Sequence, residues 1–282
     1  MSSNGVLDRP NAVIKAYADT PLGQLHYCHS HPRNPNGLPI LLLHMSASSS
    51  KCFHSMMPAL SALGYSCFAP DMPGFGSSFD PDMEPGGIAW YTDLYHSTFS
   101  KFPAFKHGCH VLGHHSGGVI GTELAARYPD FCKSLTFVGP TVMSAEDRLE
   151  LSKTFLEPFN KPVPSGSHLL KTWEYLVWEG IAKENLELLQ REVLDHVRAW
   201  RGRSQIYKCV WAYDCAEAMK NIPDECRVLG LCARDDVLWP YFDNFKHVGR
   251  EVVWKEIKGG NFGPDEDCSN IVRILHDSIS MQ

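Results

Sequence analysis

The sequence predicts an α/β protein in which helices cover both faces of a mostly parallel sheet. Residues 39–44 form a mainly apolar run, which is typical of a strand that is buried on both faces. Strand and helix patterns then alternate up to residue 138, and the alternation resumes at residue 227. Such alternation places consecutive strands parallel, because each helix carries the chain back across the sheet.

The expected elements follow in chain order. Two extended runs on either side of Thr20-Pro21-Leu22-Gly23 predict a hairpin at the start of the sheet. The eight expected strands cover residues 13–18, 24–29, 39–44, 66–70, 109–113, 134–138, 227–232 and 252–257. The helices between and after them are expected at 51–63, 88–102, 117–128, 240–248 and 269–280.

The alternation stops between residues 141 and 221. This stretch is charged, rich in helix formers and aromatic residues, and is broken once at 160–167, where two prolines occur. We therefore expect a helical insertion over the carboxyl edge of the sheet. The domain prediction is a core of residues 1–140 and 222–282 and a helical cap of residues 141–221.

Composition excludes several classes of protein. The 282 residues are 44% hydrophobic and 21% charged, which excludes a disordered, collagen-like or coiled-coil chain. With 26 basic and 32 acidic residues the net charge is −6, which argues against nucleic acid or an anionic membrane as a partner. The first residues carry no signal-peptide pattern, and ten scattered cysteines are expected to be reduced, so we expect a cytoplasmic protein.

The most informative motif is Gly113-His114-His115-Ser116-Gly117, which stands between a strand and a helix. A sharp strand-to-helix turn needs small residues two positions before and two positions after its apex. This frame places His115 at the apex. A frame centred on Ser116 is the alternative, although it puts His114 where a small residue belongs.

With this turn, the chain resembles the α/β-hydrolase superfamily over nearly its whole length, and most closely the capped branch of epoxide hydrolases and C–C hydrolases. The Gly-His-His-Ser-Gly turn also resembles a little-studied subgroup in which a Ser-Gly-Ser-His segment, here residues 165–168, recurs in the cap. The resemblance implies an α/β-hydrolase fold with an eight-stranded sheet and a helical cap. The other matching segments are 43–44 (LH), 69–78 (APDMPGFGSS), 125–130 (AARYPD) and 234–240 (RDDVLWP).

The departures from the family pattern concern the catalytic residues. Members usually carry Ser, Asp or Cys at the turn, an acid after a late strand and a His before the last helix. Here the acid matches Asp236, with Asp235 as the second choice, but Asn261 stands at the position of the His. An ordinary serine-hydrolase mechanism is therefore not expected.

A relocated imidazole is the expected catalyst. Imidazole, with an unperturbed pKa near 6.5, suits acid–base chemistry at neutral pH. We expect Asn261 to hold one ring nitrogen of His115, with Asp236 behind Asn261, and Ser116 as the alternative reactive group. Backbone N–H groups of Ser116 and of Met45 or Ser46 match the family's oxyanion hole.

Substrate contacts are expected from the cap. His168 lies in the break of the helical insertion, and Trp173 and Trp211 are the aromatic residues expected to line a pocket. No phosphate loop, CxxC pair or HExxH helix is present, so neither a cofactor nor a metal is expected. The only expected partner is a small-molecule substrate, without nucleic acid or membrane, and a homodimer is left open.

Two classes of function remain. The first is a cofactor-independent enzyme that acts by acid–base chemistry on a small apolar carbonyl compound. Its reaction is hydrolysis of an ester, lactone or C–C bond, or alternatively a lyase, isomerase or cyclase step. The second is a ligand-binding receptor with a decayed site. A titratable ring at the apex and an acid at position 236 favour the enzyme.

Overall fold

The structure is a computed structural model that describes residues 9–280 except residue 157. Its centre is one eight-stranded sheet with the order β1-β2-β4-β3-β5-β6-β7-β8. β1 and β2 form the predicted hairpin, β2 pairs antiparallel with β4, and all other pairs are parallel. The predicted fold class is confirmed. The strands are β1 (Ile14–Thr20), β2 (Gly23–Ser30), β3 (Ile40–Leu43), β4 (Cys67–Pro70), β5 (Cys109–His114), β6 (Cys132–Val138), β7 (Arg227–Ala233) and β8 (Val253–Ile257).

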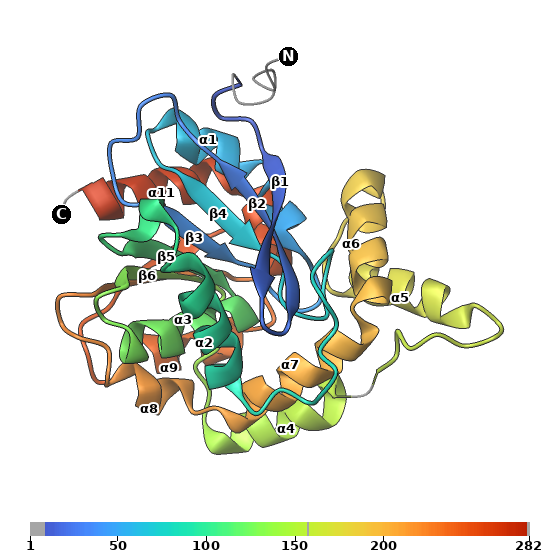
Figure 1. Ribbon diagram of the computed structural model, residues 1–282. Coiled ribbons are helices and arrows are strands. Elements are labelled where there is room, and N and C mark those ends of the chain that lie inside the picture. The colour runs from blue at the N-terminus through green and yellow to red at the C-terminus, as the bar shows by residue number, and fades with distance from the viewer. Residues whose placement is uncertain (1–8, 157, 281–282) are drawn as a thin grey trace, which may run out of the picture.

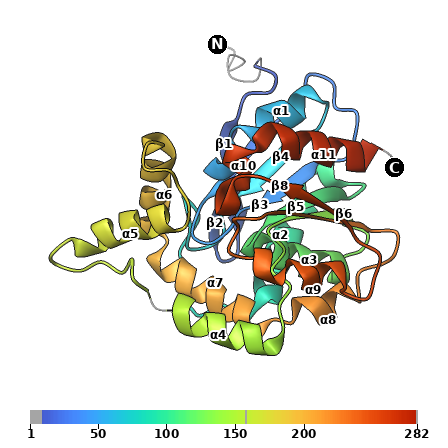
Figure 2. The same cartoon turned by 180° about the vertical axis from the view of Figure 1, so that it is seen from behind.

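Both faces of the sheet are buried, as the apolar run of β3 predicts. Successive side chains of a strand point to opposite faces, so Ile40 and Leu42 join one apolar cluster, while Leu41 and Leu43 join another. The first cluster contains α1 (Met56–Ala62) and α11 (Cys268–Ser280), and the second contains α2 (Ile88–Phe99), α3 (Ser116–Arg127) and α9 (Phe242–Lys246). Figures 1 and 2 show these two helical layers on either side of the sheet.

One predicted helix is divided in the structure. The stretch expected as a single helix at 51–63 forms a 3₁₀ turn, Ser50–Phe53, followed by α1 from Met56. Pro58 explains the division, because proline lacks an N–H group and is tolerated only in the first turn of a helix. The helix therefore begins close to Pro58, and the preceding turn follows the loop after β3.

Five helices lie between β6 and β7 in the described part of the insertion. They lie beyond one end of the sheet, and α5 extends farthest from it (Figures 1 and 2). Leu176, Leu188 and Leu189 of these helices pack in one cluster with Met45 and Phe262, which belong to loops of the core. The helices are α4 (Ala145–Phe155), α5 (Ser167–Trp178), α6 (Leu186–Arg198), α7 (Trp200–Ala212) and α8 (Cys215–Met219).

Two general expectations concern membranes and thiols. Within residues 9–280, apart from 157, no helix has the length and apolar character needed to span a membrane. All ten cysteines are free, and only Cys268 is not fully buried. The thiols therefore contribute to packing, as their scattered positions in the sequence predicted.

Candidate active site

The parallel register brings five loops together at one edge of the sheet. Leu43 of β3 pairs with Gly113 of β5, which in turn pairs with β6, and β6, β7 and β8 follow in parallel register. The carboxyl ends of these strands therefore meet at one edge, as parallel strands require. Ligands of open α/β sheets bind outside these carboxyl ends. The residues that follow the strands are 44–50, 115–116, 139–140, 234–237 and 258–262.

His115 stands at the apex of the turn between β5 and α3. Its backbone has φ 46° and ψ −112°, a strained conformation for a residue with a side chain, and Ser116 is already the first residue of the helix. A Cβ atom at Gly113 would collide with the backbone of Gly117 and Gly118, and one at Gly117 would collide with Leu43. The geometry thus matches the frame centred on His115 and not the frame centred on Ser116.

The imidazole of His115 forms a direct hydrogen bond with the carboxylate of Asp236. The distance between His115 Nε2 and Asp236 Oδ2 is 2.9 Å, and the Asp236 side chain is almost completely buried. The second carboxylate oxygen, Oδ1, accepts the N–H of Leu238 at 2.7 Å. A carboxylate only accepts hydrogen bonds, so Nε2 carries the proton and Nδ1 is left as the basic nitrogen. Asp235, the second choice of acid, is exposed.

Gly139 makes room for this pair. It follows β6 with φ 64°, and its N–H donates to the carbonyl of Leu231 in β7 at 2.8 Å. A Cβ atom at this position would overlap the ring of His115 and Oδ2 of Asp236. The absence of a side chain at residue 139 is therefore a condition for the contact between imidazole and carboxylate.

Asn261 does not hold the imidazole, so that expectation was wrong. Its Oδ1 accepts the N–H of Val237 at 3.0 Å, and its Nδ2 donates to the backbone carbonyl and to Oε2 of Glu179. The order of the two residues is reversed: Asp236 contacts His115, and Asn261 supports the backbone next to Asp236. The reason is geometric, because Asp236 follows β7 close to the apex, while Asn261 contacts Glu179 at the end of α5.

Glu179 is the site residue that sequence reasoning missed. It follows α5, lines the same cavity as His115 and interacts electrostatically with His115 and Asp236. Burial raises the pKa of its carboxyl, although the neighbouring hydroxyl of Tyr175 and the charges of His115 and Arg203 oppose this shift. Among the described residues its Oε1 has no hydrogen-bond partner. A single Glu in a charged helical segment gives no sequence signal, because only the fold brings it to Asn261.

The loop after β3 provides an N–H group next to the apex. Ser46 N–H donates to Ser116 Oγ at 2.8 Å, and the carbonyl of Met45 accepts a hydrogen bond from Nδ1 of His44. In the described residues no hydrogen bond joins Ser116 Oγ to His115. The N–H group of Ser46, one of the donors expected for an oxyanion, is thus already hydrogen-bonded to the hydroxyl of Ser116. The N–H group of Ser116 lies in the first turn of α3, where backbone donors lack partners within the helix.

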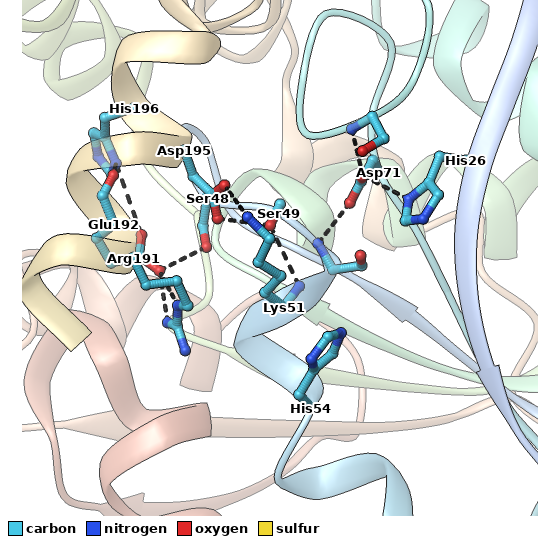
Figure 3. A network of polar contacts seen from close by, with 12 residues as sticks. His26, Ser48, Ser49, Lys51, His54, Asp71, Arg191, Glu192, Asp195 and His196 are labelled. Carbon is cyan, nitrogen blue, oxygen red and sulfur yellow. Dashed lines mark hydrogen bonds and ion pairs between the residues drawn. The ribbon is translucent and has the colours of Figure 1, made fainter. Parts of the chain in front are cut away.

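Helix α6 holds the serine-rich loop through two buried carboxylates (Figure 3). Ser48 Oγ donates to Glu192 at 3.0 Å, and Ser49 Oγ donates to Asp195 at 2.7 Å. Lys51 Nζ forms an ion pair with the other oxygen of Asp195 at 2.8 Å. Serine hydroxyls without partners would be costly at this depth, so the conformation of the loop depends on the helical insertion. We call Ser48, Ser49, Lys51, Glu192 and Asp195 the α6 clamp.

Arg191 extends this connection to the loop that carries Asn261. Its guanidinium binds Glu192 on one side and both oxygens of Asp265 on the other, with each Asp265 contact at 2.7 Å. Burial raises the pKa of Glu192 to about 7, although the charge of Arg191 opposes this shift. Helix α6 thus contacts both the serine-rich loop and the segment that follows Asn261.

The same loop is anchored from the core by Asp71. Its Oδ1 accepts the N–H of Ser50, and its Oδ2 contacts His26 Nδ1 and accepts the N–H of Ser77 (Figure 3). Burial raises the pKa of Asp71, but these hydrogen bonds and the nearby His44 outweigh burial and keep the pKa well below the usual range. The serine-rich loop is thus fixed from two sides.

A cavity of about 60 Å³ lies between these loops and the helical insertion. A cavity needs about 10–15 Å³ to hold one water, so this space has room for more than one water molecule. His115, Ser116, Met45, Ser46, Asn261 and Trp211 are among its lining residues, as expected for a shared site. The remaining described lining is mainly aromatic and aliphatic, with Phe155, Tyr175, Leu176, Tyr207, Val210 and Phe262.

His168 and Trp173 are not among the described residues that line this cavity, which corrects the expected substrate contacts. His168 lies near the exposed start of α5, where its Nδ1 accepts the N–H of Val163. Trp173 packs against the cluster of Leu176 and Leu189. α5 directs its carboxyl-terminal end, and not its amino-terminal end, toward the site. Among the described residues no group of three or more His, Cys, Asp or Glu could hold a metal.

Sheet order, register and the turn at His115 define a protein with the α/β-hydrolase fold. The family model described as alpha/beta hydrolase fold matches residues 39–165. The enol-lactonase of Burkholderia xenovorans LB400 superposes with a TM-score of 0.75 at 16% identity, covering 94% of this chain and all of the lactonase chain. This likeness shows the fold.

Two sequence relatives are similar over part of their length. A haloalkane dehalogenase of Mycobacterium marinum is 34% identical over 139 residues, or 48% of this chain and 45% of the relative. A pimeloyl-[acyl-carrier protein] methyl ester esterase of Aeromonas hydrophila is 27% identical over 127 residues, or 44% of this chain and 47% of the relative. The matched region thus spans about half the length of these curated relatives.

Proposed function

We propose that the protein is a hydrolase that cleaves an ester or lactone of a small, largely apolar molecule by general-base catalysis at His115. The observation that carries this proposal is the bond of 2.9 Å between His115 Nε2 and Asp236 Oδ2 at the apex of the turn. It leaves a basic nitrogen, Nδ1, on a ring that lines the cavity. The fold likeness to an enol-lactonase and the partial similarity to a methyl ester esterase support the reaction class.

In the proposed reaction, water is the nucleophile. His115 Nδ1 takes a proton from water as the water oxygen bonds to the carbonyl carbon, and Asp236 stabilises the imidazolium that forms. The oxyanion is stabilised by the N–H of Ser116 and the N–H of Ser46. The substrate carbonyl competes with Ser116 Oγ for the Ser46 N–H, because both oxygens accept a hydrogen bond from this one donor. Collapse of the tetrahedral intermediate breaks the bond to the leaving oxygen, which takes up a proton, and the net loss of one proton from the site returns His115 to its neutral form.

Water is favoured over Ser116 as the nucleophile by the contacts of the hydroxyl. Ser116 Oγ accepts from Ser46, and in the described residues it has no hydrogen bond to the imidazole that would have to take its proton. A serine without a base at hydrogen-bond distance is a weak nucleophile. The helical insertion from 141 to 221 acts as the cap of this site in the proposal, because its residues form most of the apolar lining.

The test is a panel of small esters, lactones and haloalkanes assayed with the parent protein, His115→Ala and Ser116→Ala. We expect hydrolysis of an ester or lactone by the parent, a loss of about 10²-fold or more in His115→Ala, and no labelling of Ser116 by phenylmethylsulfonyl fluoride. Stoichiometric labelling of Ser116 would assign the reaction to the hydroxyl. Halide release, or ligand binding without turnover, would replace the proposal by a dehalogenase or a receptor.

A further inference from the structure

We infer that Glu179 is the general acid of the reaction, held against the cavity by Asn261 and donating a proton to the leaving oxygen; this inference rests on the proposed hydrolysis. The starting point is the loss of an imidazole at position 261. In an ordinary triad a single imidazole takes a proton from the nucleophile and later gives it to the leaving group. Here His115 stands on the turn between β5 and α3, and position 261 has no His. A second group can therefore donate the proton to the leaving group.

Asn261 is built to hold a carboxyl group. Its Oδ1 is fixed by the N–H of Val237, and this contact orients Nδ2 toward Glu179. Nδ2 then donates to both Oε2 and the backbone carbonyl of Glu179, so the side chain and the end of α5 are positioned together. Position 261, which carries the catalytic base in the family, thus carries an amide that holds the carboxyl group of Glu179.

The surroundings favour a protonated Glu179. The side chain lines a mainly apolar cavity, and in the described residues Oε1 is buried without a partner, which is costly for a charged oxygen. In a neutral carboxyl, Oε2 accepts a hydrogen bond and Oε1 carries the proton. This arrangement matches the structure, because Asn261 Nδ2 donates to Oε2. Burial raises the pKa of Glu179, in the direction that keeps this proton, and outweighs the lowering by Tyr175 and by the charges of His115 and Arg203. An acid in an apolar pocket is a known way to retain a proton for catalysis.

The proton balance closes over one turnover. His115 accepts a proton from water, and the new C–O bond is formed. When the bond to the leaving oxygen breaks, Glu179 gives its proton to that oxygen, so an alcohol and an acid leave the site. The proton on His115 then returns to Glu179 through water in the cavity, and no further reactant is required.

Leaving-group dependence tests this role directly. p-Nitrophenyl acetate has a leaving group that departs without protonation, whereas ethyl acetate and δ-valerolactone release an alkoxide that needs an acid. We expect Glu179→Gln to lose about 10²-fold or more on the alkyl ester and lactone, the scale of a lost acid, and to change little on p-nitrophenyl acetate. Gln can still accept from Asn261, so the structural contact is retained.

Three variants provide the controls. Asn261→Ala should show the same selective loss, because it leaves the carboxyl unpositioned, and Glu179→Asp should recover part of the activity on the alkyl ester. Glu174→Gln changes an exposed carboxyl on α5, close to Glu179 in sequence, and should affect none of the three substrates. An equal loss on all three substrates, or no loss, in Glu179→Gln would overturn the inference and leave the proposed hydrolysis standing. A parent protein that cleaves none of the three esters would overturn both.

Discussion

His115 and Asp236 are separated by 121 positions in the sequence and joined by one hydrogen bond of 2.9 Å. The strained backbone of His115 places the ring at the end of β5, and the loop after β7 supplies a carboxylate that is buried and bonded to the N–H of Leu238. Neither group can reach the other without the parallel register of β5, β6 and β7. This contact fixes which ring nitrogen is basic and leads to the first two predictions.

Asp236→Asn should lower the rate of hydrolysis by about 10²-fold or more, because an amide can present its N–H to Nε2 and favour the wrong tautomer of His115. The measurement is kcat/KM on a substrate found in the panel of esters and lactones. Asp235→Asn is the matched control, since Asp235 is the exposed neighbour. Equal effects of the two changes would contradict a direct role of Asp236.

Gly139→Ala should abolish most activity, because its Cβ atom would overlap His115 and Asp236 Oδ2. The control is Gly166→Ala, at a glycine with φ 72° before α5, where a Cβ atom would meet nothing within 4 Å. Both changes carry a similar backbone strain of roughly 1–2 kcal/mol. The overlap at position 139 adds to this strain, so thermal unfolding should show a larger loss of stability in Gly139→Ala than in Gly166→Ala, and activity should fall only in Gly139→Ala. Full activity in Gly139→Ala would show that the pair tolerates displacement.

Ser49→Ala should destabilise the protein by about 1–3 kcal/mol, because it removes a donor from the buried Asp195. Hydrogen exchange of the peptide that contains residues 45–51 should increase in this variant, since the α6 clamp holds that loop. Ser165→Ala removes an exposed hydroxyl from the cap and is the control. Unchanged exchange in the loop would show that the hydrogen bond between Ser49 and Asp195 is not needed to hold it.

The buried carboxyl of Glu192 predicts how stability depends on pH. Burial raises its pKa from 4.5 to about 7, so between these values the folded protein holds a proton that the unfolded chain has released. The contribution of Glu192 is therefore complete below about pH 4.5 and is lost as pH rises to about 7, because the free energy of unfolding falls where the folded state binds more protons.

Urea unfolding of the parent protein and of Glu192→Gln over this pH range measures the contribution. The difference in unfolding free energy between the two proteins should change between about pH 4.5 and 7, with the parent losing stability relative to the variant as pH rises. Other carboxyl groups titrate in both proteins and cancel in the difference. A constant difference across the range would show that Glu192 is ionised throughout.

The sequence by itself determined the eight-stranded sheet, the helical layers and the residue at the apex of the turn. These features depend on short-range properties: alternating or continuous apolar runs, and the small residues Gly113 and Gly117 around His115. The division of the expected helix at 51–63 follows from Pro58, a local cause as well. The lining residues Met45 and Ser46, in the loop after β3, were predicted from the resemblance to the α/β-hydrolase superfamily.

Only the tertiary structure decided which side chains meet. Asp236 and not Asn261 contacts the imidazole, Glu179 enters the site from the end of α5, and His168 and Trp173 lie outside the cavity lining. The physical reason is that hydrogen bonds between loops depend on the register of distant strands and on the packing direction of the cap helices. Neither property is encoded in the spacing of residues along the chain, because both depend on contacts between distant residues, such as that of Arg191 in α6 with Asp265.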